Sequence, residues 1–341
     1  MFNQLGVIGC GLMGGSFALA LRRAGWVKRV VGYSKSPQTT ERARKMGVID
    51  VAAESALLAV SGSDIVVMAI PVSATETTFR AIRHLIEPGV LLMDVGSTKR
   101  DVVDAARRVL RERIGSFVPA HPITGKEASG IEHADAGLYT GRQVILTPLP
   151  QTNVVMLQKA TDVWSAMGAQ VLKMSPENHD AAFAAVSHLP HMLAFAYFGA
   201  VVKQPAGHDF LSLAGPGFRD FTRIAASSPE MWRDVLIANR EEVIKQSQLF
   251  RHALTAFEQA LQTGNTEAVE NLIREPAEGR AAWQMGSLRV PGGSGPMGGQ
   301  GGPGSPASGG AGGHAGGSAG GIAGSHSNAG TGGGAGGGAP R

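Results

Sequence analysis

The chain has 341 residues, enough for two domains with a large core. Residues 286–341 hold 25 glycines, two arginines and no acidic or aromatic residue, so we expect this tail to be disordered. Without it, 29 Lys and Arg face 27 Asp and Glu, a near-neutral balance that gives no support for nucleic-acid binding. A single cysteine, Cys10, excludes an intrachain disulfide and a cysteine-based metal cluster.

Residues 5–25 predict a strand, a glycine turn and a helix. Residues 5–8 are apolar, Gly9, Gly11 and Gly14 have the spacing G-x-G-x-x-G, and an apolar helix runs on to a stop at residue 25. In this context the first glycine permits a tight turn, the second lets a pyrophosphate approach, and the third lets the helix pack on the sheet. The helix N-terminus, beginning near Leu12 and Met13, then faces the phosphates.

The end of the second predicted strand, residues 29–33, bears on the choice of dinucleotide. In many such folds an acidic residue here holds the adenosine ribose, and this chain has Ser34 and Lys35 instead. A hydroxyl followed by a cation suits a 2′-phosphate, which favours NADP over NAD. The alternative is an ordinary polar turn in an enzyme that uses NAD.

Strands and helices continue to alternate along the chain. The apolar run of residues 64–70 predicts a strand buried on both faces, and Ile70 and Pro71 fall at its carboxyl end, where ligands bind in open sheets. Further strands are predicted at residues 90–95, 116–120, 143–147 and 170–174, with helices at 39–46, 74–86, 100–113 and 153–167. The pattern predicts an α/β, doubly wound parallel sheet of the Rossmann type.

Beyond the last strand only helical patterns occur. We expect helices at residues 176–203, with a bend near Pro190, at 229–262 and at 266–285, and broken helix at 209–226. The prediction is therefore a dinucleotide-binding domain over residues 1–174, an all-helical domain over 175–285 and the tail. No uninterrupted apolar run reaches the length of a membrane span and no leader is evident, so we expect a soluble cytoplasmic protein.

Two polar residues follow predicted strands at the edge where a nicotinamide would lie. Ser97 and His121 each stand after a strand's carboxyl end. A histidine there can accept a proton from a hydroxyl while hydride leaves the adjacent carbon. Ser97 could instead cap the next helix, and His121 could be a loop residue without a role.

Further candidates lie in the helical half. His188 and His191 are one turn apart, and they could form a zinc pair, although no third ligand supports a metal and we expect none. Arg219 and Arg223 are suited to grip a carboxylate, or else they pair with acidic neighbours at the surface.

The order of these motifs resembles the prephenate/arogenate (cyclohexadienyl) dehydrogenases of tyrosine biosynthesis. The motifs are GxGxxG, GSTK, HPITGKE, SHLPH and GFRDFTRIA, and the resemblance covers residues 5 to about 283. It implies a Rossmann domain, a helical domain that forms a homodimer, and an oxidative decarboxylation of prephenate to 4-hydroxyphenylpyruvate with NAD(P). By this similarity His121 takes the proton of the ring hydroxyl, and Ser97 orients His121.

The resemblance also assigns substrate contacts. Arg223 matches the carboxylate-binding arginine, Arg219 is a second basic candidate, His191 lies near the substrate, and Glu127 is a polar gating residue. The sequence leaves open whether prephenate, arogenate or both are used. A β-hydroxyacid or imine dehydrogenase has the same two-domain shape, and a non-catalytic dinucleotide sensor could use the tail as a tether, so both functions compete with this one.

Overall fold

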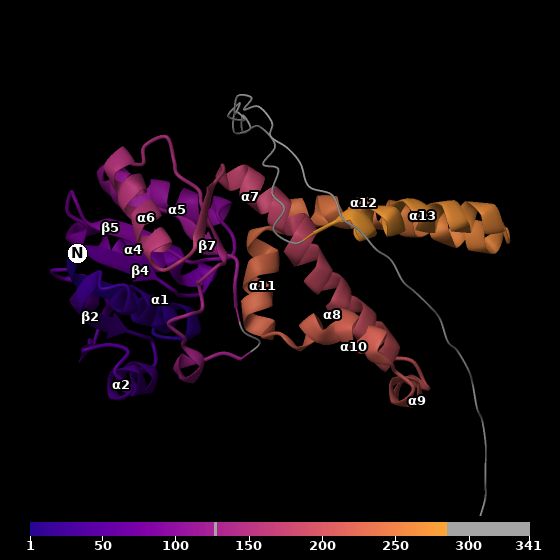
Figure 1. Cartoon of the computed structure of the whole chain (residues 1–341), viewed down its shortest axis with the longest axis horizontal. Coiled ribbons are helices and arrows are strands. Elements are labelled where there is room, and N and C mark those ends of the chain that lie inside the picture. Colours follow the sequence, from indigo (N-terminus) through magenta and orange to yellow (C-terminus); the bar gives the residue numbers. More distant parts are fainter. Residues whose placement is uncertain (126–127, 285–341) are drawn as a thin grey trace, which may run out of the picture. The chain divides into compact units, whose positions relative to one another are not determined.

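The computed structural model describes residues 1–125 and 128–284 (Figure 1). The tail that we expect to be disordered, and Lys126 and Glu127 in the loop after His121, lie outside the described residues. Contacts between residues divide the chain into residues 1–277 and 278–341, and of the second unit only residues 278–284 are described.

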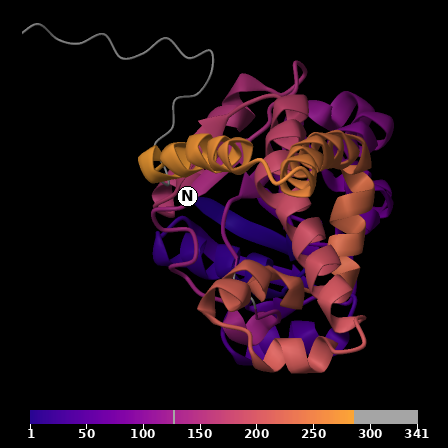
Figure 2. The same ribbon diagram turned by 90° about the vertical axis from the view of Figure 1, so that its right-hand side faces the viewer.

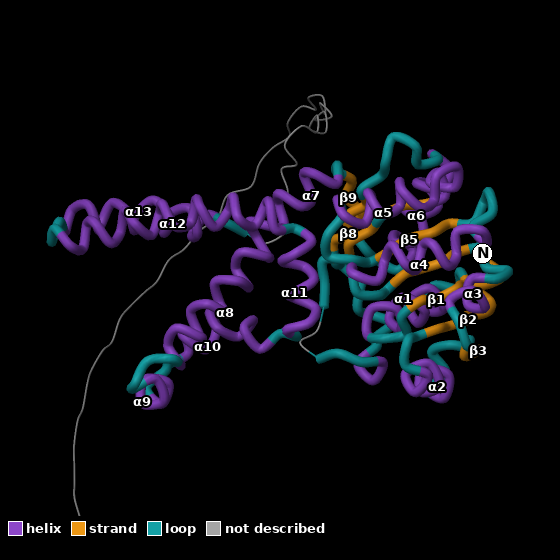
Figure 3. The backbone as a smooth tube through the Cα atoms, turned by 180° about the vertical axis from the view of Figure 1, so that it is seen from behind, coloured by secondary structure: helices purple, strands orange, loops and turns teal. Residues whose placement is uncertain are grey.

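The amino-terminal half is built on a six-stranded, all-parallel sheet, drawn in orange in Figure 3. The strand order is β3-β2-β1-β4-β5-β6, which is the order of a doubly wound sheet and confirms the predicted fold class. Its strands are β1 (Phe2–Ile8), β2 (Val27–Tyr33), β3 (Val51–Ala52), β4 (Ile65–Met68), β5 (Leu91–Asp94) and β6 (Phe117–Val118).

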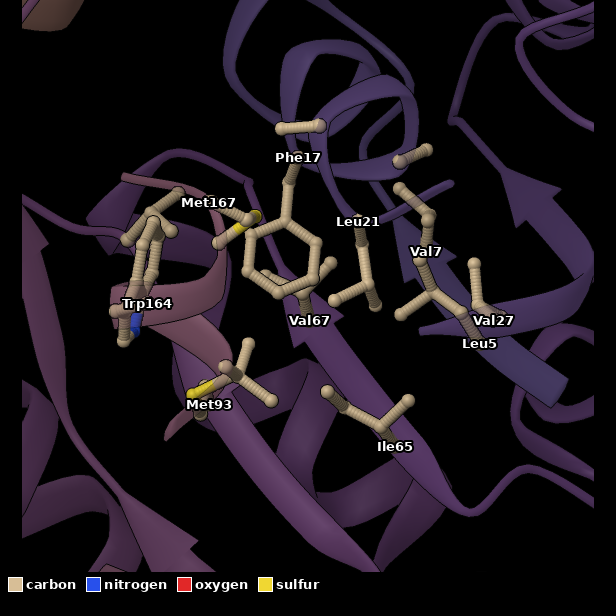
Figure 4. Close-up of a cluster of buried hydrophobic side chains, with 14 of the residues drawn as sticks. Leu5, Val7, Phe17, Leu21, Val27, Ile65, Val67, Met93, Trp164 and Met167 are labelled. Atoms are coloured by element: carbon tan, nitrogen blue, oxygen red, sulfur yellow. The ribbon is translucent and has the colours of Figure 1, made fainter. Parts of the chain in front are cut away.

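Alternate residues of the central strands enter two separate cores, one on each face of the sheet. Ile65 and Val67 of β4 lie in the first core with Phe17 and Trp164 (Figure 4), whereas Val66 faces the second. Because both faces of the sheet are covered, the sequence of β4 is apolar at every position. The covering helices are α1 (Leu12–Arg23) and α6 (Val154–Ala166) on the first face, and α4 (Thr75–Ile82) and α5 (Arg100–Leu110) on the second; α2 (Pro37–Lys45) and α3 (Ala56–Val60) complete this half.

A second, three-stranded sheet was not predicted. It consists of β7 (Ala120–Pro122), β8 (Gln143–Leu146) and β9 (Gln170–Lys173). The single strand predicted for residues 116–120 is wrong: the chain pairs with β5 as β6, passes Pro119, and then pairs antiparallel with β8 as β7. Proline cannot donate to a ladder, so the switch between sheets falls at that residue.

The carboxyl-terminal half is helical, as predicted, and Figure 2 shows its pink-to-orange helices facing the viewer. Its helices are α7 (Pro176–Phe183), α8 (Leu189–Val202), α9 (Gly207–Ser212), α10 (Pro216–Thr222), α11 (Pro229–Ala238), α12 (Arg240–Gln262) and α13 (Thr266–Ala282). The single helix predicted for residues 229–262 is divided at Asn239 into α11 and α12.

A π-helical turn, η5 (Ala184–His188), joins α7 to α8 just before Pro190. Proline lacks an N–H, and its ring collides with the carbonyl group four residues earlier in an α-helix, here that of Val186. The wider π turn at this point relieves the clash without ending the helix. The bend expected near Pro190 is therefore a local widening.

The joined helix Pro176–Val202 is long and apolar enough, by length and composition, to cross a membrane. The expectation that no segment reaches this threshold was based on uninterrupted apolar runs, and it is wrong for this helix. Its most apolar window has a mean hydropathy of 1.4, and only 17% of that window is buried within the chain. Most of this apolar surface is therefore not covered by the described residues.

Candidate active site

The glycine turn has the geometry that a dinucleotide requires. Gly9 has φ of +99°, and a Cβ atom at Gly9 would overlap the carbonyl oxygen of Ala69, while one at Gly14 would overlap that of Gly9. By contrast, a Cβ at Gly11 would meet no described atom within 4 Å. Because Gly11 precedes α1 and leaves its N-terminus uncrowded, the turn fits a pyrophosphate group.

The remaining cofactor candidates lie around this turn. The Cys10 amide donates to the Ser34 Oγ at 2.8 Å, which ties the end of β2 to the turn. The Ile70 side chain borders Gly9, and Pro71 follows it at the carboxyl end of β4. The Lys35 side chain is exposed. These positions share the carboxyl edge of the sheet with the first two residues of α1, Leu12 and Met13.

His121 lies on β7, is half-buried, and ends a chain of three side chains. Its Nδ1 is 2.8 Å from the Nε2 of His179, and the Nδ1 of His179 is 2.7 Å from the Oδ1 of Asp180. His179 and Asp180 are both fully buried in the middle of α7. The Phe183 ring packs against both imidazoles.

A buried ion pair fixes the backbone that carries His121. The Lys99 Nζ is 2.5 Å from the Oδ2 of Asp94 and also donates to the Ala120 carbonyl at 2.8 Å. The Oδ1 of Asp94 accepts the Ala120 amide at 3.2 Å. Since β7 begins at Ala120, these bonds hold His121 against the end of β5.

Ser97 does not cap α5. The helix begins after Lys99, and the backbone amides of Lys99 and Arg100 donate to the two carboxylate oxygens of Asp180, each at 2.9 Å. A carboxylate at a helix N-terminus is electrostatically favourable. Ser97 itself is half-buried, and no hydrogen bond joins it to His121 among the described residues.

On the helical side, His191 stacks on Trp232. Their ring centroids are 3.6 Å apart, and the Nδ1 of His191 donates to the Ser187 carbonyl at 2.9 Å. The indole N–H of Trp232 is buried and, within the described chain, has no hydrogen-bond partner. This arrangement leaves the Nε2 of His191 without a hydrogen bond to any described residue.

The two arginines are placed differently. The positive charge of Arg223 contributes to lowering the pKa of His191, after the larger effect of burial, so Arg223 lies near that ring. Arg219 is exposed and contacts the carboxylate of its neighbour Asp220 at 3.1 Å, which agrees with a surface pair. Glu127 lies outside the described residues.

His188 is a buried partner of other protein groups. Its Nδ1 is 3.0 Å from the Nδ2 of Asn239, and its ring meets Trp232 edge-on. No set of three His, Cys, Asp or Glu residues that could hold a metal ion occurs in residues 1–125 and 128–284.

Burial and positive neighbours keep the histidines of the site neutral. Burial, followed by the charges of His179, Lys99 and His188, holds the pKa of His121 well below its usual range. The same two causes, burial first and then Lys99 and His188, lower the pKa of His179 to about 2. A neutral imidazole has the lone pair that a base needs, while the lowered pKa weakens its affinity for the proton.

Sequence reasoning missed Asp94, Lys99 and Asp180 as parts of the site. Asp94 gave a usable signal, because a carboxylate inside a buried apolar strand must be paired. Asp180 gave none, because its partners lie 80 residues earlier in the chain.

A parallel doubly wound sheet with an open glycine turn, beside a neutral histidine and a helical domain, defines a dinucleotide-dependent dehydrogenase. Residues 17–173 match the sequence model described as "Prephenate dehydrogenase, nucleotide-binding domain", and residues 175–275 match "Prephenate dehydrogenase, dimerization domain". The chain belongs to the prephenate dehydrogenase family, and it is an NAD(P)-dependent oxidoreductase.

Individual relatives agree. The chain is 36% identical over 280 residues to prephenate dehydrogenase of Bacillus subtilis (strain 168), covering 80% of this chain and 73% of the relative. It is 35% identical to the solved prephenate dehydrogenase of A. aeolicus in complex with hydroxyphenyl propionate and NAD+, with a TM-score of 0.77 and coverage of 82% and 98%. It is 27% identical to Synechocystis arogenate dehydrogenase, with a TM-score of 0.70 and coverage of 82% and 99%.

Proposed function

We propose that the chain oxidises prephenate and releases its ring carboxylate, yielding 4-hydroxyphenylpyruvate, CO2 and a reduced dinucleotide. The observation that carries this proposal is the neutral, half-buried His121, which the Asp94–Lys99 pair holds at the end of β5, in a sheet whose β1 leads into the glycine turn. When bound, the nicotinamide accepts the hydride from the ring carbinol carbon. His121 takes the proton of the hydroxyl on that carbon, and loss of CO2 then makes the ring aromatic, so this chemistry needs no metal ion.

The other residues hold the substrate in this proposal. Arg223 binds a carboxylate, and His191, stacked on Trp232, bounds the ring site. Ser97 orients the hydroxyl toward His121. Arg219 pairs with the neighbouring Asp220, and Glu127 is assigned its gating role by the family resemblance.

Arogenate is the alternative substrate, favoured by the likeness to a solved arogenate dehydrogenase. The two molecules differ in a keto group against an ammonium group, so a carboxylate near that end of the pocket would favour arogenate. For the cofactor, Ser34 and the exposed Lys35 place no carboxylate at the ribose position, which favours NADP over NAD. The NAD+ bound by the A. aeolicus relative keeps NAD as the alternative.

We further infer that the protein is a cytoplasmic homodimer assembled through the helical half. That half carries a series of large apolar side chains exposed in the single chain: Tyr197, Phe198, Phe210, Leu213, Phe221, Ile244, Leu249, Leu254 and Leu261. Exposed apolar surface on this scale marks an interface. The apolar helix Pro176–Val202 belongs to the same half, so dimer formation, rather than a bilayer, accounts for its low burial.

The test is turnover of prephenate and arogenate, each with NAD+ and NADP+, followed by absorbance of the reduced dinucleotide. We expect turnover with prephenate, arogenate or both, and a lower KM for NADP+ than for NAD+. Absence of turnover with all four pairs would refute the proposal.

A further inference from the structure

The chain His121–His179–Asp180 has a defined hydrogen-bond direction. It starts from Asp180, whose two carboxylate oxygens each accept a backbone amide, Lys99 N at Oδ1 and Arg100 N at Oδ2, both at 2.9 Å. Burial raises the pKa of Asp180, while these two amides and the Lys99 charge favour the ionised carboxylate. We take Asp180 as ionised on the geometry of the two amides, and an ionised carboxylate has no proton to give. The Nδ1 of His179, 2.7 Å from Oδ1, must therefore be the donor.

The same hydrogen-bond direction continues through the imidazole rings of His179 and His121. A neutral imidazole carries one N–H, so when His179 donates from Nδ1 its Nε2 has a lone pair. That Nε2 lies 2.8 Å from the Nδ1 of His121, which must then carry the hydrogen. The Nε2 of His121 is left as an acceptor, and no described protein atom forms a hydrogen bond with it.

The surrounding charges preserve this single-proton arrangement. Lys99 is fully buried, and its ammonium group is occupied by Asp94 and the Ala120 carbonyl. Its positive charge disfavours a second proton on either imidazole, in the same direction as burial. Both rings therefore remain neutral, and the direction set by Asp180 reaches His121.

We propose that His179 and Asp180 are positioning residues that fix His121 in the Nδ1–H tautomer and so aim its Nε2 lone pair at the substrate hydroxyl. In the reaction the hydroxyl O–H bond breaks, an Nε2–H bond forms, and the O–H electron pair becomes the second bond of the new carbonyl group. The C–H electron pair leaves as hydride to the dinucleotide. When CO2 leaves, the electron pair of the broken C–C bond makes the ring aromatic and the carbonyl electrons move to oxygen. That oxygen takes the proton back from Nε2, while the Nδ1–H bond to His179 is kept throughout.

The inference rests on the proposed function for the identity of the hydroxyl, whereas the tautomer is a property of the free protein. We would therefore record 15N NMR spectra of the full chain labelled at its histidines, in which the protonated and bare ring nitrogens have different shifts. Signals of His121 and His179 are assigned by their loss in H121Q and H179Q. We expect both rings as Nδ1–H tautomers at pH 7.5; a His121 with its hydrogen on Nε2 would overturn the proposal.

A matched pair of variants tests the consequence for catalysis. In H179Q an amide oxygen can still accept the His121 Nδ1–H bond, whereas H179L offers no acceptor. We expect H179L to lower kcat by about 10-fold to 10²-fold with KM for prephenate unchanged, and H179Q to recover most of that loss. Equal kcat values for H179L and H179Q would show a packing role and overturn the proposal.

The two measurements separate the inference from the proposed function. If no substrate pair is turned over, the tautomer in the NMR spectrum still decides the inference. If turnover occurs but His121 has the other tautomer, the proposed function stands and the inference fails.

Discussion

The surroundings of His188 predict how strongly the free energy of unfolding depends on pH. Its side chain is 1% exposed, and Asn239 donates from Nδ2 to the Asp180 carbonyl at 2.8 Å and to the His188 Nδ1 at 3.0 Å. An amide nitrogen can only donate, so the Nδ1 of His188 must be unprotonated. Burial lowers the pKa of His188 to about 4, with the charge of His191 acting in the same direction and that of Asp180 opposing it.

The sign of the pH dependence follows from this shift. The unfolded chain binds a proton at His188 below pH 6.5, whereas the folded chain binds it only near pH 4. The contribution of the neutral ring to stability is therefore complete above pH 6.5 and is lost as the pH falls to about 4. A shift of this size corresponds to about 3 kcal/mol over that window.

The perturbation is His188→Gln, which keeps an acceptor for Asn239 but does not titrate. Urea unfolding at fixed protein concentration, from pH 7.5 to 4.5, gives the free energy of unfolding of both proteins. Groups that do not interact with His188 titrate alike in both proteins and cancel in the difference, whereas the coupling of His188 to His121 and His179 is part of what the difference measures. We expect the advantage of the wild type to shrink steadily below pH 6.5; a difference that is constant across the range would refute the reasoning.

Four further substitutions test the site. Gly11→Ala meets open space and should leave the urea midpoint unchanged while raising KM for the dinucleotide at least about tenfold, and an unchanged KM would remove Gly11 from the phosphate site. His121→Asn should lower kcat by about 10²–10⁴-fold, and near-normal kcat would exclude His121 as the base. Arg223→Ala should mainly raise KM for prephenate; a lower kcat at constant KM would contradict a ground-state anchor. Ser34→Asp should shift preference from NADP+ toward NAD+, and if the ratio of kcat/KM values does not change, Ser34 does not select the cofactor.

The parts of the fold that the sequence predicts are those with a clear hydrophobic pattern. The run around Ile65 and Val67 is apolar at every position because both faces of β4 are covered. Local pattern does not predict β3, which has two residues, or the change of sheet at Pro119, because pairing partners decide these features. The division at Asn239 likewise depends on bonds to His188 and Asp180, which lie more than 50 residues away.

The candidate site likewise contains residues that the sequence indicates and residues that it does not. His121 could be picked out as a candidate because it follows the β6 segment at the carboxyl edge of the parallel sheet, although it lies on β7 of the second sheet. The buried carboxylate of Asp180 could not, since it acts where the middle of α7 meets the start of α5. Arg219 and Arg223 look equivalent in sequence, and the turn of the chain from α10 into η6 (Arg223–Ala226) separates them: Arg219 contacts Asp220, while Arg223 lies near His191.

The central claim is that hydride leaves the ring carbinol carbon of prephenate for the dinucleotide while the ring loses its carboxylate. The most direct test uses prephenate carrying deuterium on that carbon, with mass spectrometry of both products. We predict one deuterium in the reduced dinucleotide, none on the aromatic ring, and one 4-hydroxyphenylpyruvate formed per dinucleotide reduced. Deuterium retained in the organic product, or released to water, would contradict the account.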